Sequence, residues 1–325
     1  MPSDVSRTDR IVAVVVAFDR RELVQETLAA LAAQTVAPAA IVVVDNASSD
    51  GTADVVRARF PEVDLTVLPR NTGGAGGFTA GMARALAVHD ADAVWLMDDD
   101  TVPDPGALAA LLAARRAAPA GTALLASAVR WVDGRPHPMN TPRVRPGASR
   151  ASIRRAARHG AYPVRSASFV SLLVEADAVR LHGLPVADYF LWNDDFEFST
   201  RLLRRAPGYV ATASTVEHRT RTFGAADVDP GARFFYEVRN KTWLMRLSPS
   251  LTAAERVLYS VAALRSWTRT VRRSRDRRLL LSGLVRGLRA GLATRPRPNV
   301  EVLAGLGATT DQVARIDAAS AGARA

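Results

Sequence analysis

Apolar and polar positions alternate in long blocks along the first 130 residues of this 325-residue chain. Four apolar runs, rich in β-branched residues, have the pattern of strands buried on both faces, namely 11–18, 40–45, 65–68 and 93–97. Three segments between them predict helices, namely 22–34, 48–60 (with Ser49 and Asp50 as candidate N-caps) and 78–88. Since strands that alternate with helices form parallel sheets covered on both faces, the pattern predicts an α/β fold.

The pattern changes after residue 130. Residues 131–165 are rich in Pro, Arg and Gly and predict a long excursion from the sheet. Residues 166–176 are strand-like, and residues 194–206 predict a helix. From about residue 232 onward the spacing is helical, with breaks near Pro249 and at 295–299. We therefore expect an α/β domain followed by a helical region.

Composition and charge narrow the class of protein. The chain has no cysteine, which excludes disulfides and thiolate metal sites. Its N-terminus is polar, and no apolar run approaches the roughly 18 residues of a membrane-spanning helix, so we expect a soluble or surface-bound protein. The net charge is +11, and residues 265–297 hold 11 arginines against one acidic residue, Asp276, a net +10. The positive charge is therefore concentrated in one C-terminal segment.

Candidate chemistry lies at the carboxyl ends of the predicted strands, where open parallel sheets bind ligands. These ends carry Arg20, Asp45, Asn71 and the run Asp98-Asp99-Asp100. Three consecutive aspartates are costly to ionise together unless a cation is present, and their hard oxygen ligands suit Mg²⁺ or Mn²⁺. The alternative, a solvated acidic turn, is less favoured at a strand end. We therefore expect a divalent-cation site here.

A second acidic cluster lies in LWNDDFEF, residues 191–198. Asp194 and Asp195 repeat the acidic pattern of the first cluster, although acidic residues also favour the first turn of a helix for electrostatic reasons. Trp192 beside them offers an aromatic face on which a sugar or a ring stacks. His218 follows a further predicted strand, and the pattern leaves open whether it is a ligand or a core histidine.

A glycine-rich stretch, PRNTGGAGGFTAG, covers residues 69–81. Its spacing fits neither a dinucleotide fingerprint, which would need glycine in place of Thr79, nor a P-loop, because the only lysine is Lys241. We expect a loop in which bare backbone gives clearance and N–H donors to a ligand.

These segments resemble family 2 glycosyltransferases with a GT-A fold over roughly residues 11–245. The resemblance rests on VVVDNASSDGT, the DDD run as a DXD motif, the NDD cluster with a later His, and RFFYEVRNKTW at 233–243. Within that family, RNTGGAGGF is similar to a pattern of bacterial galactofuranosyltransferases. The resemblance implies a tail at 1–10, a catalytic domain at 11–230 (donor half 11–130, acceptor half 131–230) and a basic helical region at 231–325.

The resemblance also implies a role for each residue. Asp45 looks like the carboxylate that reads the uracil ring, with Arg20 near the nucleotide. Asp98 and Asp100 look like the DXD pair, and His218 is similar to a histidine that completes the metal shell. Either Asp194 or Asp195 occupies the general-base position. The remaining expected substrate-binding residues are Asn71, Gly74, Gly76, Asp99 and Trp192.

The implied activity is metal-dependent, inverting transfer of galactofuranose from UDP-galactofuranose to a polyprenyl-diphosphate-linked glycan. A rhamnosyltransferase that uses dTDP-rhamnose is the alternative enzyme. The clustered arginines favour contact with an anionic membrane, and hence a peripheral position on the cytoplasmic face, over a solvated helical bundle. A nucleic-acid-binding protein is a remote alternative, because it leaves both acidic clusters unexplained; we expect no nucleic-acid partner.

Overall fold

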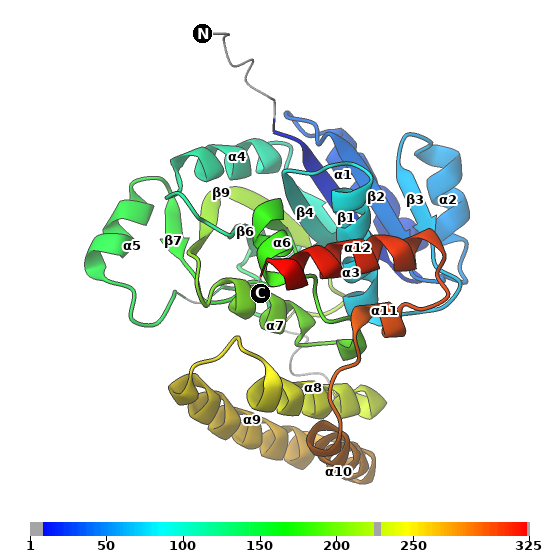
Figure 1. Ribbon diagram of the computed structural model, residues 1–325, viewed down its shortest axis with the longest axis vertical. Helices are drawn as coiled ribbons and strands as arrows, with labels where there is room; N and C mark the ends of the chain where they lie inside the picture. Colours follow the sequence, from blue (N-terminus) through cyan, green and yellow to red (C-terminus); the bar gives the residue numbers. More distant parts are fainter. Residues whose placement is uncertain (1–8, 143, 224–228, 324–325) are drawn as a thin grey trace.

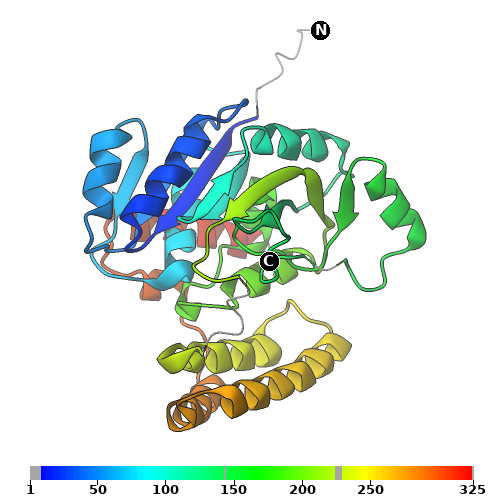
Figure 2. The same cartoon turned by 180° about the vertical axis from the view of Figure 1, so that it is seen from behind.

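The computed structural model describes residues 9–142, 144–223 and 229–323. Figures 1 and 2 show a layered α/β domain and, beside it, a separate layer of helices α8, α9 and α10. Most of the expected tail at 1–10 lies outside the described residues. The GT-A type of fold expected from the sequence, a mostly parallel sheet with helices on both faces followed by a helical region, is confirmed.

The parallel half of the sheet follows the sequence pattern closely. Its strands are arranged in the order β3 (Asp64–Val67), β2 (Ala40–Asp45), β1 (Ile11–Ala17) and β4 (Ala93–Asp98). Successive residues of β1 point to opposite faces and all seven are buried, because helices cover both sides. Val12, Val14 and Val16 belong to one apolar core, whereas Ala13 and Val15 belong to the other.

The helices of the α/β domain divide between these two cores. On one face lie α1 (Arg21–Ala32), α2 (Thr52–Arg59) and α4 (Ala107–Ala117). On the other lie α3 (Gly73–Ala87), α6 (Ala176–His182) and, across them, α12 (Ala308–Gly322). The N-cap of α2 is Gly51 in a left-handed conformation, so Ser49 and Asp50 are not its caps. Asp50 instead accepts hydrogen bonds from the backbone N–H groups of Arg21 and Thr52.

The second half of the sheet is mixed. Beyond β4 the order is β8 (Leu172–Glu175), β6 (Leu124–Arg130), β9 (Gly208–His218) and β5 (Thr101–Pro103), and β7 (Ala161–Pro163) also pairs with β9. β8 runs antiparallel to β4, which turns the sheet from parallel to mixed. Only four residues of the strand-like segment 166–176 form a strand. The expected excursion at 131–165 contains the helix α5 (Arg150–Ala157) and β7.

Helices dominate the C-terminal part, as expected. After η1 (Ala187–Tyr189), α7 (Asp194–Leu202) and η3 (Gly231–Arg233) come α8 (Phe234–Leu247), α9 (Ala253–Arg273), α10 (Arg277–Ala293) and α11 (Asn299–Val302). Helices α8, α9 and α10 share a small core that includes Phe234, Val238 and Trp267. The chain then returns to the α/β domain, where Val313 and Ile316 of α12 join the core on the α3 face. The helical region is therefore not one unit in space.

Most of the glycine-rich stretch, residues 73–81, is helical and not the expected loop, and only residues 69–72 precede the helix. α3 begins at Gly73, five residues before the helix that the sequence pattern predicted. A Cβ atom at Gly77 would lie 2.5 Å from Cγ1 of Val16, and one at Gly81 would lie 2.4 Å from Cγ1 of Val14. These two glycines therefore let α3 lie directly on β1, a packing requirement that outweighs the low helix propensity of glycine.

Candidate active site

Sheet register brings the first acidic residues to a common edge. β1 lies between β2 and β4, with Ala17 paired to Asp45 on one side and Val16 paired to Asp98 on the other. Asp45 and Asp98 therefore end the two strands that flank β1. In β1, β2 and β4 all other residues are uncharged, so the charged side chains of these strands lie at their carboxyl ends, where the sequence pattern places the candidate chemistry.

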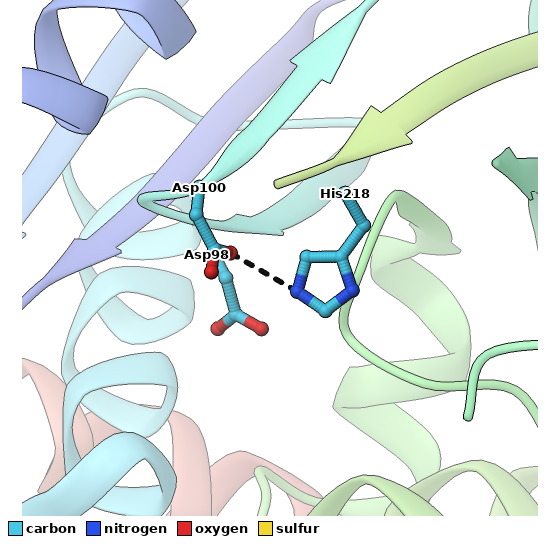
Figure 3. A group of neighbouring side chains, drawn as sticks. All are labelled: Asp98, Asp100 and His218. Atoms are coloured by element: carbon cyan, nitrogen blue, oxygen red, sulfur yellow. Dashed lines mark ion pairs between the residues drawn. The ribbon is translucent and has the colours of Figure 1, made fainter. Parts of the chain in front are cut away.

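A tight turn and a long strand assemble three potential metal ligands. Asp98 ends β4, and Asp100 directly precedes Thr101 of β5, which pairs with His218 at the end of β9. Potential ligand atoms of Asp98, Asp100 and His218 all lie within 4.8 Å of one another. Figure 3 shows the two carboxylates beside the imidazole ring, whose Nε2 lies 3.0 Å from Oδ1 of Asp100.

The electrostatics of this cluster fit a divalent cation. Burial, with the charge of Asp100 as a second cause, raises the pKa of Asp98 to about 8. Burial also opposes ionisation of Asp100, but the hydrogen bond and charge of His218 outweigh it and lower the pKa of Asp100. The full set of carboxylates is therefore difficult to ionise at neutral pH without added positive charge. Two carboxylates and one imidazole suit Mg²⁺ or Mn²⁺ in both ligand type and spacing.

A residue that the sequence analysis missed orients His218. Oδ1 of Asn140 lies 2.8 Å from Nδ1 of His218, and the amide nitrogen of Asn140 donates to Oγ of Ser168. The ring of His137 packs at 4.9 Å from that of His218. Asn140 and His137 come from the excursion at 131–165, where no periodic pattern or motif marks them.

Asp99 and Arg20 lie beside the metal-ligand cluster and have separate roles: Asp99 binds the loop after β1, and Arg20 supplies positive charge. Oδ2 of Asp99 accepts the backbone N–H of Phe18 at 2.9 Å, so this carboxylate holds the loop after β1. Burial raises the pKa of Asp99 to about 7, against this hydrogen bond. The positive charge of Arg20 acts on both Asp99 and Asp100, which places its guanidinium near the acidic turn.

Asp45 is buried with one oxygen free to accept. Its Oδ2 accepts the backbone N–H of Ser48 at 3.1 Å. Within the described part of the chain, its buried Oδ1 has no hydrogen-bond partner. Because a buried polar atom without a partner is costly, this oxygen is suited to an incoming N–H or O–H donor.

The second acidic cluster opens helix α7. Asp194 and Asp195 are its first two residues, and burial raises the pKa of Asp194 to about 8 and that of Asp195 to about 6. The negative charge of Asp194 also contributes to the raised pKa of Asp98, so the structure brings the two acidic clusters close together. Trp192 precedes them in a left-handed conformation, with the guanidinium of Arg233 5.4 Å from its ring centre.

The remaining expected substrate-binding residues lie at the start of α3. Oδ1 of Asn71 accepts the backbone N–H of Gly73 at 2.7 Å. A Cβ atom at Gly76 would meet the side chain of Thr72 at 2.4 Å, so packing within the helix start explains this glycine. A Cβ atom at Gly74 would have no atom within 4 Å, which leaves Gly74 as the position that faces open space.

None of the helices that the structure describes combines the length and apolar composition that crossing a bilayer requires.

Comparisons with known proteins show the family of the chain and agree with its fold. Residues 9–227 match the family model described as "Glycosyltransferase like family 2". A galactofuranosyltransferase, GlfT1, of Mycobacterium tuberculosis is 32% identical over 260 residues, which cover 73% of this chain and 83% of that protein. GlfT1 of Mycolicibacterium smegmatis is 31% identical over 215 residues, covering 62% and 67%. Residues 1–349 of S. aureus TarS, solved in complex with UDP, align with a TM-score of 0.56 at 14% identity, covering 97% of this chain and 89% of that one.

Proposed function

The chain belongs to the family described as glycosyltransferase like family 2, and we propose that it transfers galactofuranose from UDP-galactofuranose to a polyprenyl-diphosphate-linked glycan of the cell wall. The observation that carries this proposal is the identity of about one third to galactofuranosyltransferases over most of the chain, in a segment that contains both acidic clusters. The family match shows that the chain is a glycosyltransferase. Its donor, its acceptor and the role of each residue are what we propose.

Asp45 and Arg20 are the proposed nucleotide-binding residues. Among the described residues, the buried Oδ1 of Asp45 has no hydrogen-bond partner, and this supports binding of the imide N–H of a uracil ring. Arg20 supplies positive charge beside the acidic turn, where it lowers the pKa of Asp100. TarS, which shares the fold, was solved in complex with UDP, and this supports a uridine nucleotide in the proposed donor. Gly74, Asn71 and Asp99 border the same space in this proposal.

Asp98, Asp100 and His218 would hold the cation. When bound, Mg²⁺ or Mn²⁺ supplies charge neutralisation for the diphosphate of the donor. The three residues bring two negative charges and a neutral nitrogen, because the imidazole gives up its Nε2 proton when it serves as a ligand. His218 is kept in position by Asn140 from behind and by the pairing of Thr101 with β9.

Asp194 or Asp195 is the proposed general base. The carboxylate accepts the proton of an acceptor hydroxyl as the hydroxyl oxygen forms a bond to the anomeric carbon of the donor. The bond from that carbon to the diphosphate oxygen breaks, its electron pair leaves with UDP, and the configuration inverts. The raised pKa values, about 8 and about 6, suit a base that works near neutral pH. Trp192 offers the acceptor sugar an aromatic face.

The layer of α8, α9 and α10 is the proposed membrane contact. On α9, Val257, Leu258, Val261 and Leu264 are 41–66% exposed at helical spacing. The same face continues into Arg265, Arg269, Arg272 and Arg273, which line a shallow groove with Leu264 and Thr268. On α10, Leu281, Val285 and Leu292 are 49–60% exposed. Apolar residues next to clustered arginines favour the surface of an anionic membrane, which is also where a polyprenyl-linked acceptor and a cytoplasmic donor meet.

A donor screen tests the proposed function. The full chain is incubated with a polyprenyl-diphosphate-linked glycan in anionic vesicles and with either UDP-galactofuranose or dTDP-rhamnose, and products are identified by mass spectrometry. We expect addition of a hexose from UDP-galactofuranose and no addition from dTDP-rhamnose. Addition of a deoxyhexose alone would replace the proposal with rhamnosyl transfer.

A further inference from the structure

The loop that leads into helix α7 has an unusual backbone. Phe190, Trp192 and Asn193 have φ values of 63°, 66° and 66°, which lie in the left-handed region. This region costs free energy for residues other than glycine, most of all for bulky side chains such as Phe and Trp. Asn193 is also the N-cap of α7, so its backbone sets the direction in which Asp194 and Asp195 leave the loop. Something outside the loop has to stabilise this conformation.

Asn240 of α8 makes the required contacts. Its side chain is fully buried, and its amide nitrogen lies within hydrogen-bond distance of three successive parts of the loop. The nitrogen is 2.8 Å from the carbonyl oxygens of Tyr189 and Leu191 and 2.9 Å from that of Trp192. No acceptor-only or apolar side chain at position 240 satisfies these carbonyl groups, since the two N–H groups of the amide are the donors.

The neighbours of Asn240 on α8 add to this contact. Arg239 donates to the carbonyl oxygens of Asp188 and Tyr189, and its Nε donates to Oδ1 of Asn240 at 3.0 Å. The guanidinium lies 4.2 Å from the ring centre of Trp243, which fixes it in place. Glu237, one turn earlier, accepts from the side-chain amide of Asn193 at 2.9 Å. One turn of α8 thus binds the loop from Asp188 to Asn193.

We infer that Asn240 is a positioning residue for the reaction: by binding the carbonyl groups of the loop, it holds the start of α7 where its carboxylates face the donor edge. The inference rests on the proposed function, in which Asp194 or Asp195 is the base. It gives α8 a specific task in acceptor activation that the family match does not assign, because residues 9–227 end before α8 begins. It also explains why an uncharged amide, and not a carboxylate, is buried at position 240.

Substitution of Asn240 tests the inference. Asn240→Asp keeps the shape but turns a carboxylate toward three carbonyl oxygens, and Asn240→Ala removes the donors. We expect both to lower kcat by about 10²-fold, the size of effect that about 1 Å of misplacement produces. The KM for the donor and the Kd for UDP should stay within about twofold of wild type. Among the described residues no hydrogen bond joins the loop to Asp45 or Arg20, and the loop meets α3 through the backbone, from the N–H of Ala75 to the carbonyl oxygen of Phe190. Asn240→Ser, which keeps one donor, should have an intermediate kcat.

Val238→Ala is the matched control. Val238 is fully buried on the same helix but packs against Gly287 of α10, in the core shared by α8, α9 and α10, which includes no residue of the loop. Its substitution should lower Tm and leave kcat near wild type at temperatures well below unfolding. If Asn240→Ala and Asn240→Ser have the kcat of Val238→Ala, the inference is wrong. A parallel loss of kcat and UDP affinity would also overturn it, since that pattern indicates general damage to the fold. If Asn240→Asp does not fold, the Ala and Ser variants decide.

Two further variants separate this inference from the proposed function. If Asp194→Asn and Asp195→Asn both keep normal turnover, the base assignment fails, and with it the reason for positioning α7. If one of them loses turnover while the Asn240 variants keep it, the base assignment stands and only the inference about Asn240 fails.

Discussion

The side chains of Asn140 and His218 form one contact that fixes the chemistry of the candidate metal site, with Oδ1 of Asn140 2.8 Å from Nδ1 of His218. An amide oxygen only accepts, so the proton of the neutral imidazole stays on Nδ1 and the lone pair of Nε2 is directed toward Asp100. When the imidazole is protonated on both nitrogens, its Nε2–H donates to Asp100, and this contact raises the pKa of His218 against the effect of burial.

Removal of the Asn140 amide should weaken metal binding. For Asn140→Ala we expect a loss of Mn²⁺ affinity of about 10- to 100-fold, the usual effect of losing a partner that orients a ligand. Titration of Mn²⁺ followed by electron paramagnetic resonance measures this without any need for turnover. Ser168→Ala, which removes only the contact on the other side of Asn140, should have a much smaller effect. Unchanged affinity in Asn140→Ala would mean that His218 needs no support or is not a ligand.

Loss of the general base should lower turnover without loss of donor binding. Of Asp194→Asn and Asp195→Asn, the one that replaces the base should reduce kcat by about 10²- to 10⁴-fold. Both keep the size of the side chain, and neither residue lies at the edge that holds Asp45. Steady-state kinetics and calorimetry with UDP separate the two effects. Normal kcat in both variants would place the base elsewhere.

The stability of the metal-free protein should fall as pH rises from about 5 to about 8.5. Burial raises the pKa of Asp98 and Asp194 to about 8 and that of Asp99 to about 7, all above the ordinary aspartate value of 3.8. Between pH 4 and 8 the folded state therefore binds more protons than the unfolded state, so the stabilising contribution present at low pH is lost as pH rises through these values. His218, whose pKa is also raised, acts in the same direction.

Thermal unfolding at a series of pH values measures this effect. Tm should decrease toward pH 8.5 in EDTA, and added Mn²⁺ should raise it most at the high-pH end, where the carboxylates are ionised. Asp98→Asn should flatten the pH dependence in EDTA. If Tm in EDTA stays constant or rises over this pH interval, the raised pKa values of Asp98, Asp99 and Asp194 are contradicted.

The arginines at the α9–α10 turn should be needed for transfer to a membrane-bound acceptor but not for transfer to a soluble one. Arg272, Arg273, Arg277 and Arg278 are exposed, and each basic residue near an anionic surface contributes roughly 1 kcal/mol within a Debye length. Replacement of all four with Gln should reduce binding to anionic liposomes, most clearly at low salt, and impair transfer to a long-chain lipid acceptor. Transfer to a short, water-soluble acceptor should be retained. Equal loss with both acceptors would indicate a structural role for these arginines.

Much of the fold could be predicted because one physical rule dominates its N-terminal half. A strand buried on both faces has to be continuously apolar, and β1 and β2 were recognised on that basis almost to the residue. The same reasoning failed for the start of α3, where glycine suggested a loop. The deciding contacts, Gly77 on Val16 and Gly81 on Val14, join segments about 60 residues apart and leave no local signal in the sequence.

The candidate site likewise contains residues that the sequence predicts and residues that it does not. Residues at strand ends, such as Asp45 and Asp98, were predictable because the sheet alone places them. Asn140 and Asn240 were not recognised as site residues, because each acts through a contact that only the folded chain creates. No motif or periodicity surrounds Asn140, and although Asn240 lies in the family segment RFFYEVRNKTW, that segment does not indicate what its amide binds.

Metal-dependent galactofuranosyl transfer is tested most directly by one rate measurement on a single preparation of the full chain. The initial rate with UDP-galactofuranose and a lipid-linked acceptor is measured after thorough removal of metal with EDTA, and again after Mn²⁺ or Mg²⁺ is restored. The geometry of Asp98, Asp100 and His218 predicts no transfer in EDTA, recovery with either cation, and no recovery in Asp100→Ala although that variant remains folded. Full transfer in EDTA by the wild-type protein would contradict the assignment of these residues to a metal site.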